Sequence, residues 1–299
     1  MRYSSLAFRL QTLLFAVTLS LTVVTHAQVP ASCTFRFFPA VTGFPTPWTP
    51  LGVNDWGTVV GGGVEGGEVR LGGTLITVSW VTQFVDRDNG GITVGFTPPV
   101  PGSGSNYGWF LWSPQSYTNL DHLTLGNLIP VDHLTPGNVN EFTIRHRNKY
   151  GSTVGTYLDS NSKVHGFKRW NGGSYVRLDY PGSSRTAAEA INDLGAIVGS
   201  YTDAGGKQHG FIYANGQWAT LDFPQATSTD LAGIANGGTI VGNAQVNGTG
   251  VAFVYRSGTF KTISVPNFPA NSTTVVGTSL NLGVILGTYP NGGFTANCN

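Results

Sequence analysis

A five-residue pattern, Gly-x-x-(Val/Leu)-Gly, occurs six times in this chain and constrains its fold more than any other feature. The first glycines of the copies follow one another at intervals of 34, 60, 44, 43 and 45 residues. The copies are Gly57–Gly61, Gly91–Gly95, Gly151–Gly155, Gly195–Gly199, Gly238–Gly242 and Gly283–Gly287. A period of this length, with short strands and turn residues throughout, is the signature of a repeat β architecture.

Two consecutive units show the internal order of the repeat. They start at Ile191 and Ile234, and each reads as strand, Asn/Gly turn, strand, loop, strand, turn, strand. The turn that ends at Gly195 needs a left-handed residue, a conformation that glycine adopts without steric cost. The strand that follows, Ala196–Tyr201, is apolar on both faces near its middle, which predicts burial between neighbouring sheets. Four strands in about 45 residues correspond to one propeller blade.

The first 27 residues have the composition of a secretory signal peptide. Two arginines precede an apolar run from Leu13 to Val24, and a small-residue cleavage site ends at Ala27. The run is too short for a comfortable membrane span. The segment Pro30–Cys33 partly resembles a lipoprotein box, with a proline where leucine is expected. We expect cleavage near Ala27, secretion to the extracellular space or the periplasm, and a mature chain of residues 28–299 that is one β-propeller domain.

The spacing across the two termini predicts how this propeller closes. From Gly283 through the C-terminus, and on from residue 28 to Gly57, the interval is 46 residues. Because this matches the period, we expect the N-terminal and C-terminal strands to share one blade. The predicted fold is all-β: a six-bladed β-propeller with four-stranded antiparallel blades.

The only two cysteines support this closure. Alignment of Phe38-Pro39 with Phe223-Pro224 puts Cys33 in the place of Trp218 and Cys298 in the place of Asn215, on either side of a hairpin turn. Directly opposed residues of a hairpin lie within disulfide range. A secreted chain with two cysteines normally oxidises them. We therefore predict a disulfide between Cys33 and Cys298 that replaces this turn.

The units resemble the HAF extracellular repeat family, which is named for a His-Ala-Phe signature. The resembling residues of the fourth unit are Asn192-Asp193-x-Gly195-x-Ile197-Val198-Gly199-x-Tyr201, His209-Gly210-Phe211-x-Tyr213 and Leu221-Asp222-Phe223-Pro224. The third unit matches through His165-Gly166-Phe167 and Leu178-Asp179-Tyr180-Pro181, whereas Val251-Ala252-Phe253 and Gly292-Gly293-Phe294 lack the histidine. The resemblance implies a secreted bacterial repeat protein, and it implies no particular reaction. Because His165 and His209 recur at the same repeat position, we expect them to be architectural.

Composition and motifs exclude several classes of function. The chain carries 16 basic and 15 acidic residues, and loss of two arginines with the signal peptide leaves a net charge of −1. Without a basic excess, nucleic acid is not an expected partner. No nucleophile elbow, zinc-protease helix, phosphate loop or dinucleotide fingerprint is present. We expect no cofactor, no metal and no membrane span, and we expect a monomer.

Departures from the repeat mark the candidate ligand site, because long loops on a rigid scaffold are where function concentrates. The loops 40–50, 97–106 and 121–138 are expected on one face of the ring. Their residues that can stack on a sugar or hydrogen-bond its hydroxyls are Trp48, Tyr107, Asp121, His122, Asp132 and His133. The two Asp-His pairs are eleven residues apart, a weak signal for a metal.

A second candidate site lies on the strand predicted over residues 141–147. Arg145 and Arg147 are two residues apart, so they should share a face, line the channel and either pair with acids or hold an anion. The sequence therefore predicts a binding or scaffold module, whose ligand is carbohydrate or another cell-surface polymer. The alternative is a glycan-processing hydrolase or lyase whose site is assembled from several blades, since such a site leaves no linear motif.

Overall fold

The computed structural model describes residues 31–39, 49–63, 66–71, 74–78, 83–87, 93–97, 108–113, 116–119, 142–170 and 175–298. The regular elements among these residues are strands, apart from one 3-10 turn at Ala270–Ser272, and turns and short loops connect them. Within these ranges no helix is long or apolar enough to cross a membrane. The predicted signal peptide lies outside the described residues.

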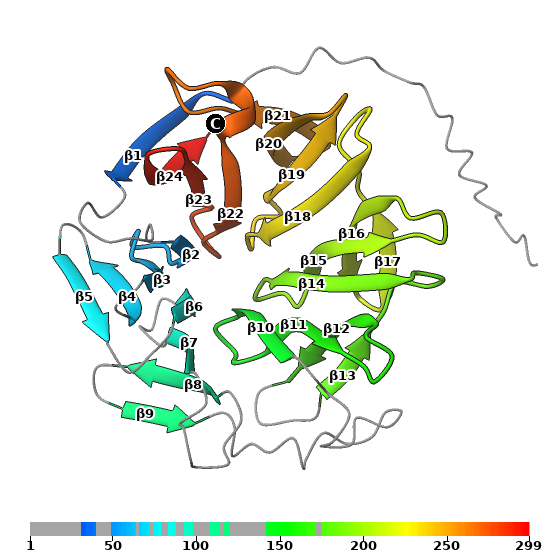
Figure 1. Ribbon diagram of the computed structural model, residues 1–299, viewed down its shortest axis with the longest axis horizontal. Coiled ribbons are helices and arrows are strands. Elements are labelled where there is room, and N and C mark those ends of the chain that lie inside the picture. The colour runs from blue at the N-terminus through cyan, green and yellow to red at the C-terminus, as the bar shows by residue number, and fades with distance from the viewer. Residues whose placement is uncertain are drawn as a thin grey trace, which may run out of the picture.

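The strands form six four-stranded antiparallel sheets that stand around a common axis (Figure 1). Sheet 1 contains β2 (Thr49–Val53), β3 (Val59–Gly63), β4 (Gly66–Leu71) and β5 (Thr74–Val78). Sheet 2 contains β6 (Gln83–Arg87), β7 (Thr93–Thr97), β8 (Gly108–Ser113) and β9 (Ser116–Asn119). Sheet 3 contains β10 (Phe142–Arg147), β11 (Thr153–Leu158), β12 (Val164–Arg169) and β13 (Tyr175–Leu178).

The remaining sheets complete the ring. Sheet 4 contains β14 (Arg185–Ile191), β15 (Ile197–Thr202), β16 (Gln208–Ala214) and β17 (Gln217–Thr220). Sheet 5 contains β18 (Ser228–Ile234), β19 (Ile240–Val246), β20 (Thr249–Arg256) and β21 (Thr259–Ile263). Sheet 6 contains β22 (Thr274–Thr278), β23 (Ile285–Tyr289), β24 (Gly292–Cys298) and, from the other end of the chain, β1 (Cys33–Pro39). The predicted all-β propeller with four-stranded antiparallel blades is confirmed.

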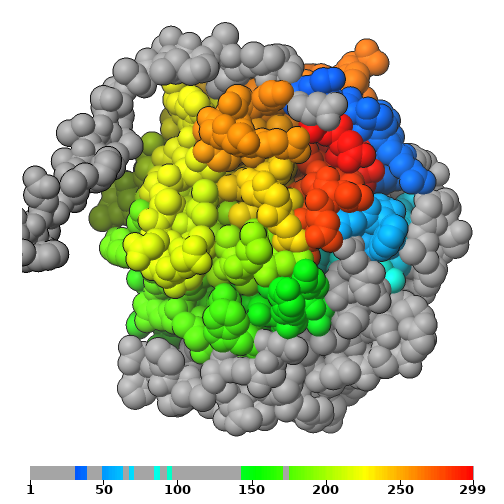
Figure 2. Space-filling model, turned by 180° about the vertical axis from the view of Figure 1, so that it is seen from behind, coloured from blue at the N-terminus to red at the C-terminus, as the bar shows by residue number. Residues whose placement is uncertain are grey.

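The ring closes where the two ends of the chain pair. Strand β1 runs antiparallel to β24, and Cys33 lies opposite Cys298 with the two Cα atoms 4.1 Å apart. The predicted disulfide is present. Figure 2, which views the ring from behind, shows the last strands in red beside the first strands in blue. One covalent bond thus joins segments 265 residues apart.

The predicted alignment of Cys33 with Trp218 is wrong by two residues. In sheet 4, Trp218 pairs with Tyr213, and the chain turns at Asn215 and Gly216. In sheet 6, Gly293 is opposite Phe38, as Gly210 bonds Leu221 in sheet 4. Phe38 therefore corresponds to Leu221 and not to Phe223, and Cys33 takes the place of Gly216. The alignment of the two Phe-Pro pairs was wrong because these pairs lie at positions two residues apart in the two sheets. The disulfide replaces the two turn residues themselves.

The two glycines of the repeated pattern have different structural roles in sheets 1, 3, 4, 5 and 6, where the structure describes both. The first glycine lies in the predicted turn between the first and second strands with a positive φ, for example +82° at Gly195. The second lies where the first and second strands pair, and a Cβ at Gly199 would overlap the Ala187 carbonyl and touch the Phe211 ring. Phe211 is fully buried. The pattern is therefore repeated in these five sheets because each of them needs one left-handed turn and one close backbone approach.

Candidate functional site

The first strand of every sheet is bulged at the same position. In each of the six, the register with the second strand shifts by one residue, so one residue of the first strand has no opposite partner. Such a bulge turns the extra side chain away from the regular alternation. The six bulged residues are Leu51, Val85, Arg145, Glu189, Ala232 and Val276. All six line one pocket on the axis of the ring.

This axial pocket is small and has two unlike walls. Its volume is about 110 Å³, enough for several water molecules or one small ligand group. Leu51, Val85, Ala232 and Val276 make its apolar wall, from sheets 1, 2, 5 and 6. The charged wall comes from sheets 3 and 4, where the bulged residues are Arg145 and Glu189.

Arg145 and Glu189 form an ion pair across the boundary between sheets 3 and 4. The Arg145 Nε lies 3.5 Å from the Glu189 Oε2, and the arginine side chain is half exposed whereas the glutamate is mostly buried. Burial raises the pKa of Glu189, and the Arg145 guanidinium opposes that rise. Burial likewise raises the pKa of Asp230, on the first strand of sheet 5. The Arg145–Glu189 pair offers the pocket a hydrogen-bond donor next to an acceptor.

A second acid and a histidine line the same pocket. Asp86 is buried, and its Oδ2 lies 3.8 Å from the His146 Nε2. The carboxylate also accepts hydrogen bonds from the amides of Arg87 at 2.8 Å and Arg147 at 2.7 Å. Because Asp86 thereby joins sheets 2 and 3, it holds the charged wall in position. Glu189 is the acid whose side chain projects from a bulge into the pocket.

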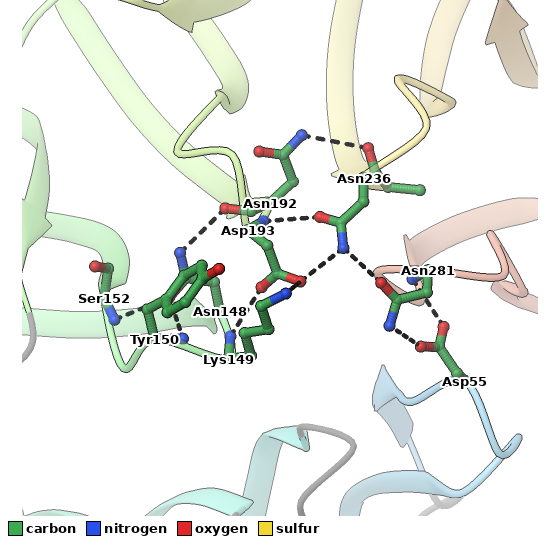
Figure 3. Close-up of polar contacts among 10 residues, drawn as sticks. Asp55, Asn148, Lys149, Tyr150, Ser152, Asn192, Asp193, Asn236 and Asn281 are labelled. Atoms are coloured by element: carbon green, nitrogen blue, oxygen red, sulfur yellow. Dashed lines mark hydrogen bonds and ion pairs between the residues drawn. The ribbon is translucent and has the colours of Figure 1, made fainter.

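The rim of the pocket is built from the turns that follow the first strands. Val53 lines the pocket, and Asn54, the next residue, begins the turn of sheet 1. Thr278 also lines the pocket, just before the turn of sheet 6. Hydrogen bonds join these turns into a polar belt (Figure 3). Asn236 donates to Asp193 and to Asn281, each at 2.6 Å. The belt continues to Asp55, which accepts from Asn281, and to Lys149, whose amide donates to Asp193.

The third residue of each such turn points away from this belt into solvent. Four of the five turns in the described residues carry a large apolar side chain there, while the fifth carries Gly237. These exposed residues, which we call the apolar tips, are Trp56, Tyr150, Leu194 and Leu282. Trp56 and Leu194 are each 78% exposed and Leu282 is 67% exposed. Four large apolar side chains therefore remain exposed at equivalent positions of the repeat.

The repeated histidines have an architectural environment, as expected. His165 lies between Asp179, with 2.7 Å from Nδ1 to Oδ2, and Asp159, with 3.2 Å from Nε2 to Oδ2. His209 lies in the same way between Asp222 and Asp203. Asp159 and Asp203 lie in the loop between the second and third strands of their sheets, and each also accepts backbone hydrogen bonds within that loop. These hydrogen bonds lower the pKa of both aspartates. The histidine thus ties the second-to-third strand loop to the end of the fourth strand.

The sequence-predicted site residues have two different outcomes. Trp48, Tyr107, Asp121, His122, Asp132 and His133 lie outside the described residues, so their predicted role stays a prediction. Two bounds of their loops change, because Thr49-Pro50 belong to β2 and Thr97 belongs to β7. Arg145 lines the axial pocket, but Arg147 does not. The prediction that they share a face is wrong, because the bulge at Arg145 breaks the alternation on which it rested.

Sequence reasoning missed the other pocket residues. Glu189 stands alone among alanines in a first strand, and a lone acid in an apolar strand was the available signal. Nothing in the sequence marks the bulge that turns Glu189 toward the axis, because a bulge is a property of the pairing between two strands.

Comparisons with known proteins bear on the fold alone. No protein-family model matches the chain, and no curated protein matches it significantly in sequence. A solved structure described as a candidate gluconolactonase is similar, with a TM-score of 0.51 and 13% identity over 91% of this chain and 94% of that chain. AofleA from Arthrobotrys oligospora has a TM-score of 0.49 and 12% identity, covering 89% of this chain and 86% of that one. The extracellular domain of a candidate one-component system from B. thetaiotaomicron has a TM-score of 0.46 and 10% identity, over 88% of this chain and 39% of that one.

Proposed function

We propose that this chain is a secreted, six-bladed repeat propeller of the HAF type that binds carbohydrate or another cell-surface polymer in its axial pocket. The observation that carries the proposal is the axial pocket itself, into which all six first strands turn their bulged residue. One wall is apolar and the other offers the Arg145–Glu189 donor and acceptor. A sugar ring has the same division, with C–H groups on its faces and hydroxyls at its edge.

Secretion belongs to the same proposal. The disulfide between Cys33 and Cys298 is typical of an oxidising compartment. The signal-peptide composition of residues 1–27 and the HAF-type motifs agree with it.

A glycan-array screen of the mature protein tests the binding proposal. We expect at least one neutral glycan to bind, and we expect Arg145→Gln to lower its affinity about tenfold or more, because the variant removes a charged hydrogen-bond donor. Arg36→Gln is the matched control, since Arg36 is an exposed arginine on β1 outside the pocket. If the protein binds no glycan of the array although circular dichroism verifies its fold, the proposed function is contradicted.

A glycan-processing hydrolase or lyase is the second candidate. Two carboxylates, Asp86 and Glu189, line one pocket, and the raised pKa of Glu189 is the property that a general acid needs. Against it, Asp86 is engaged by two backbone amides. Product analysis of any bound glycan separates the two: new chain ends that disappear in Glu189→Gln indicate an enzyme, and an unchanged glycan indicates a binding module.

A further inference from the structure

The apolar tips are not distributed evenly with respect to the pocket. Leu51 and Val276, in the apolar wall, lie on β2 and β22. The turns that follow these two strands carry Trp56 and Leu282. Two strands of the apolar wall therefore continue into the turns that carry these two tips, five residues after Leu51 and six residues after Val276.

Trp56 and Leu282 belong to turns that are held together. The Asp55 carboxylate accepts the amides of Asn281 and Leu282, each at 2.9 Å, and the Asn281 side chain at 2.6 Å. These three bonds fix the turn of sheet 1 against the turn of sheet 6, and Figure 3 shows the two that Asn281 donates. The Trp56 amide is in turn bonded to the Asn54 side chain at 3.1 Å. The backbone of this exposed shoulder is thus ordered before any ligand arrives, which reduces the entropic cost of binding.

The opposite side of the rim differs in chemistry. The turn of sheet 3 carries Tyr150, whose ring has the Lys149 ammonium 4.9 Å from its centroid. Lys149 also pairs with Asp193 of sheet 4, with 3.5 Å between Nζ and Oδ2, and this pair raises the pKa of Lys149. One face of Tyr150 is therefore already occupied by a cation, whereas Trp56 is 78% exposed.

We infer, on the basis of the proposed function, that Trp56 and Leu282 form a second sugar subsite, which holds the residue next to the one in the axial pocket. The small pocket takes one edge of the residue at the end of a neutral glycan chain. The next residue leaves the pocket over its apolar wall and stacks its C–H face on Trp56, the arrangement that an aromatic ring offers to an apolar surface. The preferred ligand is therefore an oligosaccharide of at least two residues, bound by its end.

The charges of the pocket favour a neutral sugar over a sugar acid. Its described ionisable lining consists of Arg145 and His146 against Asp86 and Glu189. Arg145 is already paired with Glu189. A carboxylate ligand would therefore have to compete with a buried acid for the single arginine. A lipid bilayer fits less well, because it would cover the apolar tips and seal these charged groups from water without reaching them.

Titration calorimetry with two series of neutral sugars tests the subsite. One series is glucose, cellobiose and cellotriose, and the other is glucose, maltose and maltotriose. In the series that binds, we expect the disaccharide to bind about tenfold tighter than glucose. Trp56→Ala should remove that gain and leave the affinity for glucose unchanged, whereas Trp56→Phe should keep most of it. Leu194→Ala, which removes an equally exposed tip beside the charged wall, is the matched control and should change neither affinity.

The outcomes separate the subsite from the proposed function. Equal affinities for glucose and for both longer sugars, or a gain that survives Trp56→Ala, would overturn the subsite alone. Absence of binding to both series and to every glycan of the array would overturn the proposed function and this inference together. Sedimentation at several concentrations completes the test: a dimer that Trp56→Ala dissociates would assign these tips to a contact between two copies and overturn the subsite.

Discussion

At the scale of single residues, the axial pocket depends on where a side chain leaves its strand. Arg145 and Glu189 lie in two strands whose polar and apolar residues do not alternate regularly, and a bulge in each strand directs the side chain toward the axis. The pair is asymmetric in burial, because the arginine side chain is 48% exposed and the glutamate side chain is 20% exposed. The acid is therefore the group whose ionisation costs most.

Glu189 gives the first stability prediction, on pH dependence. Because burial raises its folded-state pKa, the folded protein holds this proton more tightly than the unfolded chain. Stability is therefore fully present below the ordinary pKa of 4.5 and falls as pH rises from there toward the raised value. Glu189→Gln removes this loss, so the variant should gain stability relative to the wild type by about 1.4 kcal/mol for each unit of the rise.

Thermal melts of both proteins between pH 4 and pH 8 measure this difference. Asp230 titrates in the same direction, and its charge is one of the causes that raise the pKa of Glu189. The comparison is therefore made with Asp230→Asn in both proteins. A difference in melting temperature that stays constant over this range would show that Glu189 does not carry the effect.

At the scale of elements, the five sheets whose turn between the first two strands is described depend on that turn and on two glycines. The Asn192 side chain caps its own turn at Ala196 and also donates to Ala235 in the next sheet, and Asn148 does the same toward Asn192. One amide group therefore closes a turn and links two sheets. This explains why asparagine begins these turns in three of the sheets.

Both glycines should be sensitive to substitution, for different physical reasons. Gly195→Val forces a β-branched residue into a left-handed turn and should lower the free energy of unfolding by about 1 kcal/mol or more. Gly199→Ala puts a methyl group against the Ala187 carbonyl and the Phe211 ring, so we expect a loss of about 1–3 kcal/mol. Gly237→Ala is the control, because it is exposed, has open space around it and should stay within about 0.5 kcal/mol. Urea unfolding measures all three, and three equal midpoints would contradict both roles.

At the scale of the whole molecule, closure of the ring depends on the last sheet. β1 is held by pairing with β24 and by the disulfide, while β22 and β23 continue the chain from sheet 5. Every other sheet is made from one continuous stretch of chain. Opening this sheet exposes apolar core on both sides, among them Phe294 and Ile285.

The disulfide should therefore dominate the stability of the whole ring. A covalent link between residues 265 apart restricts the unfolded chain, and the chain-entropy model gives roughly 5 kcal/mol as an upper estimate. The double variant Cys33→Ser/Cys298→Ser should lose a large part of this in urea unfolding but keep its strand content by circular dichroism. Thiol titration of the unfolded, unreduced wild type should find no free thiol, and two free thiols would contradict the link.

The sequence by itself determined the features that repeat along the chain. The period of the glycine pattern, the left-handed turns, the order of strands within a unit and the meeting of the two ends all follow from local backbone chemistry and from spacing. They could be predicted because each sheet solves the same local problem, and errors such as the placement of Cys33 were limited to a two-residue shift.

Only the tertiary structure decided what happens on the axis. The bulges arise where two strands pair, so the sequence of one strand does not reveal them, and the predicted common face of Arg145 and Arg147 failed for that reason. The pocket also takes its walls from six strands far apart in the chain, and its charged and apolar sides appear only once the ring is closed. A site built from one residue of each repeat has no linear motif, because its chemistry is set by the geometry that brings those residues together.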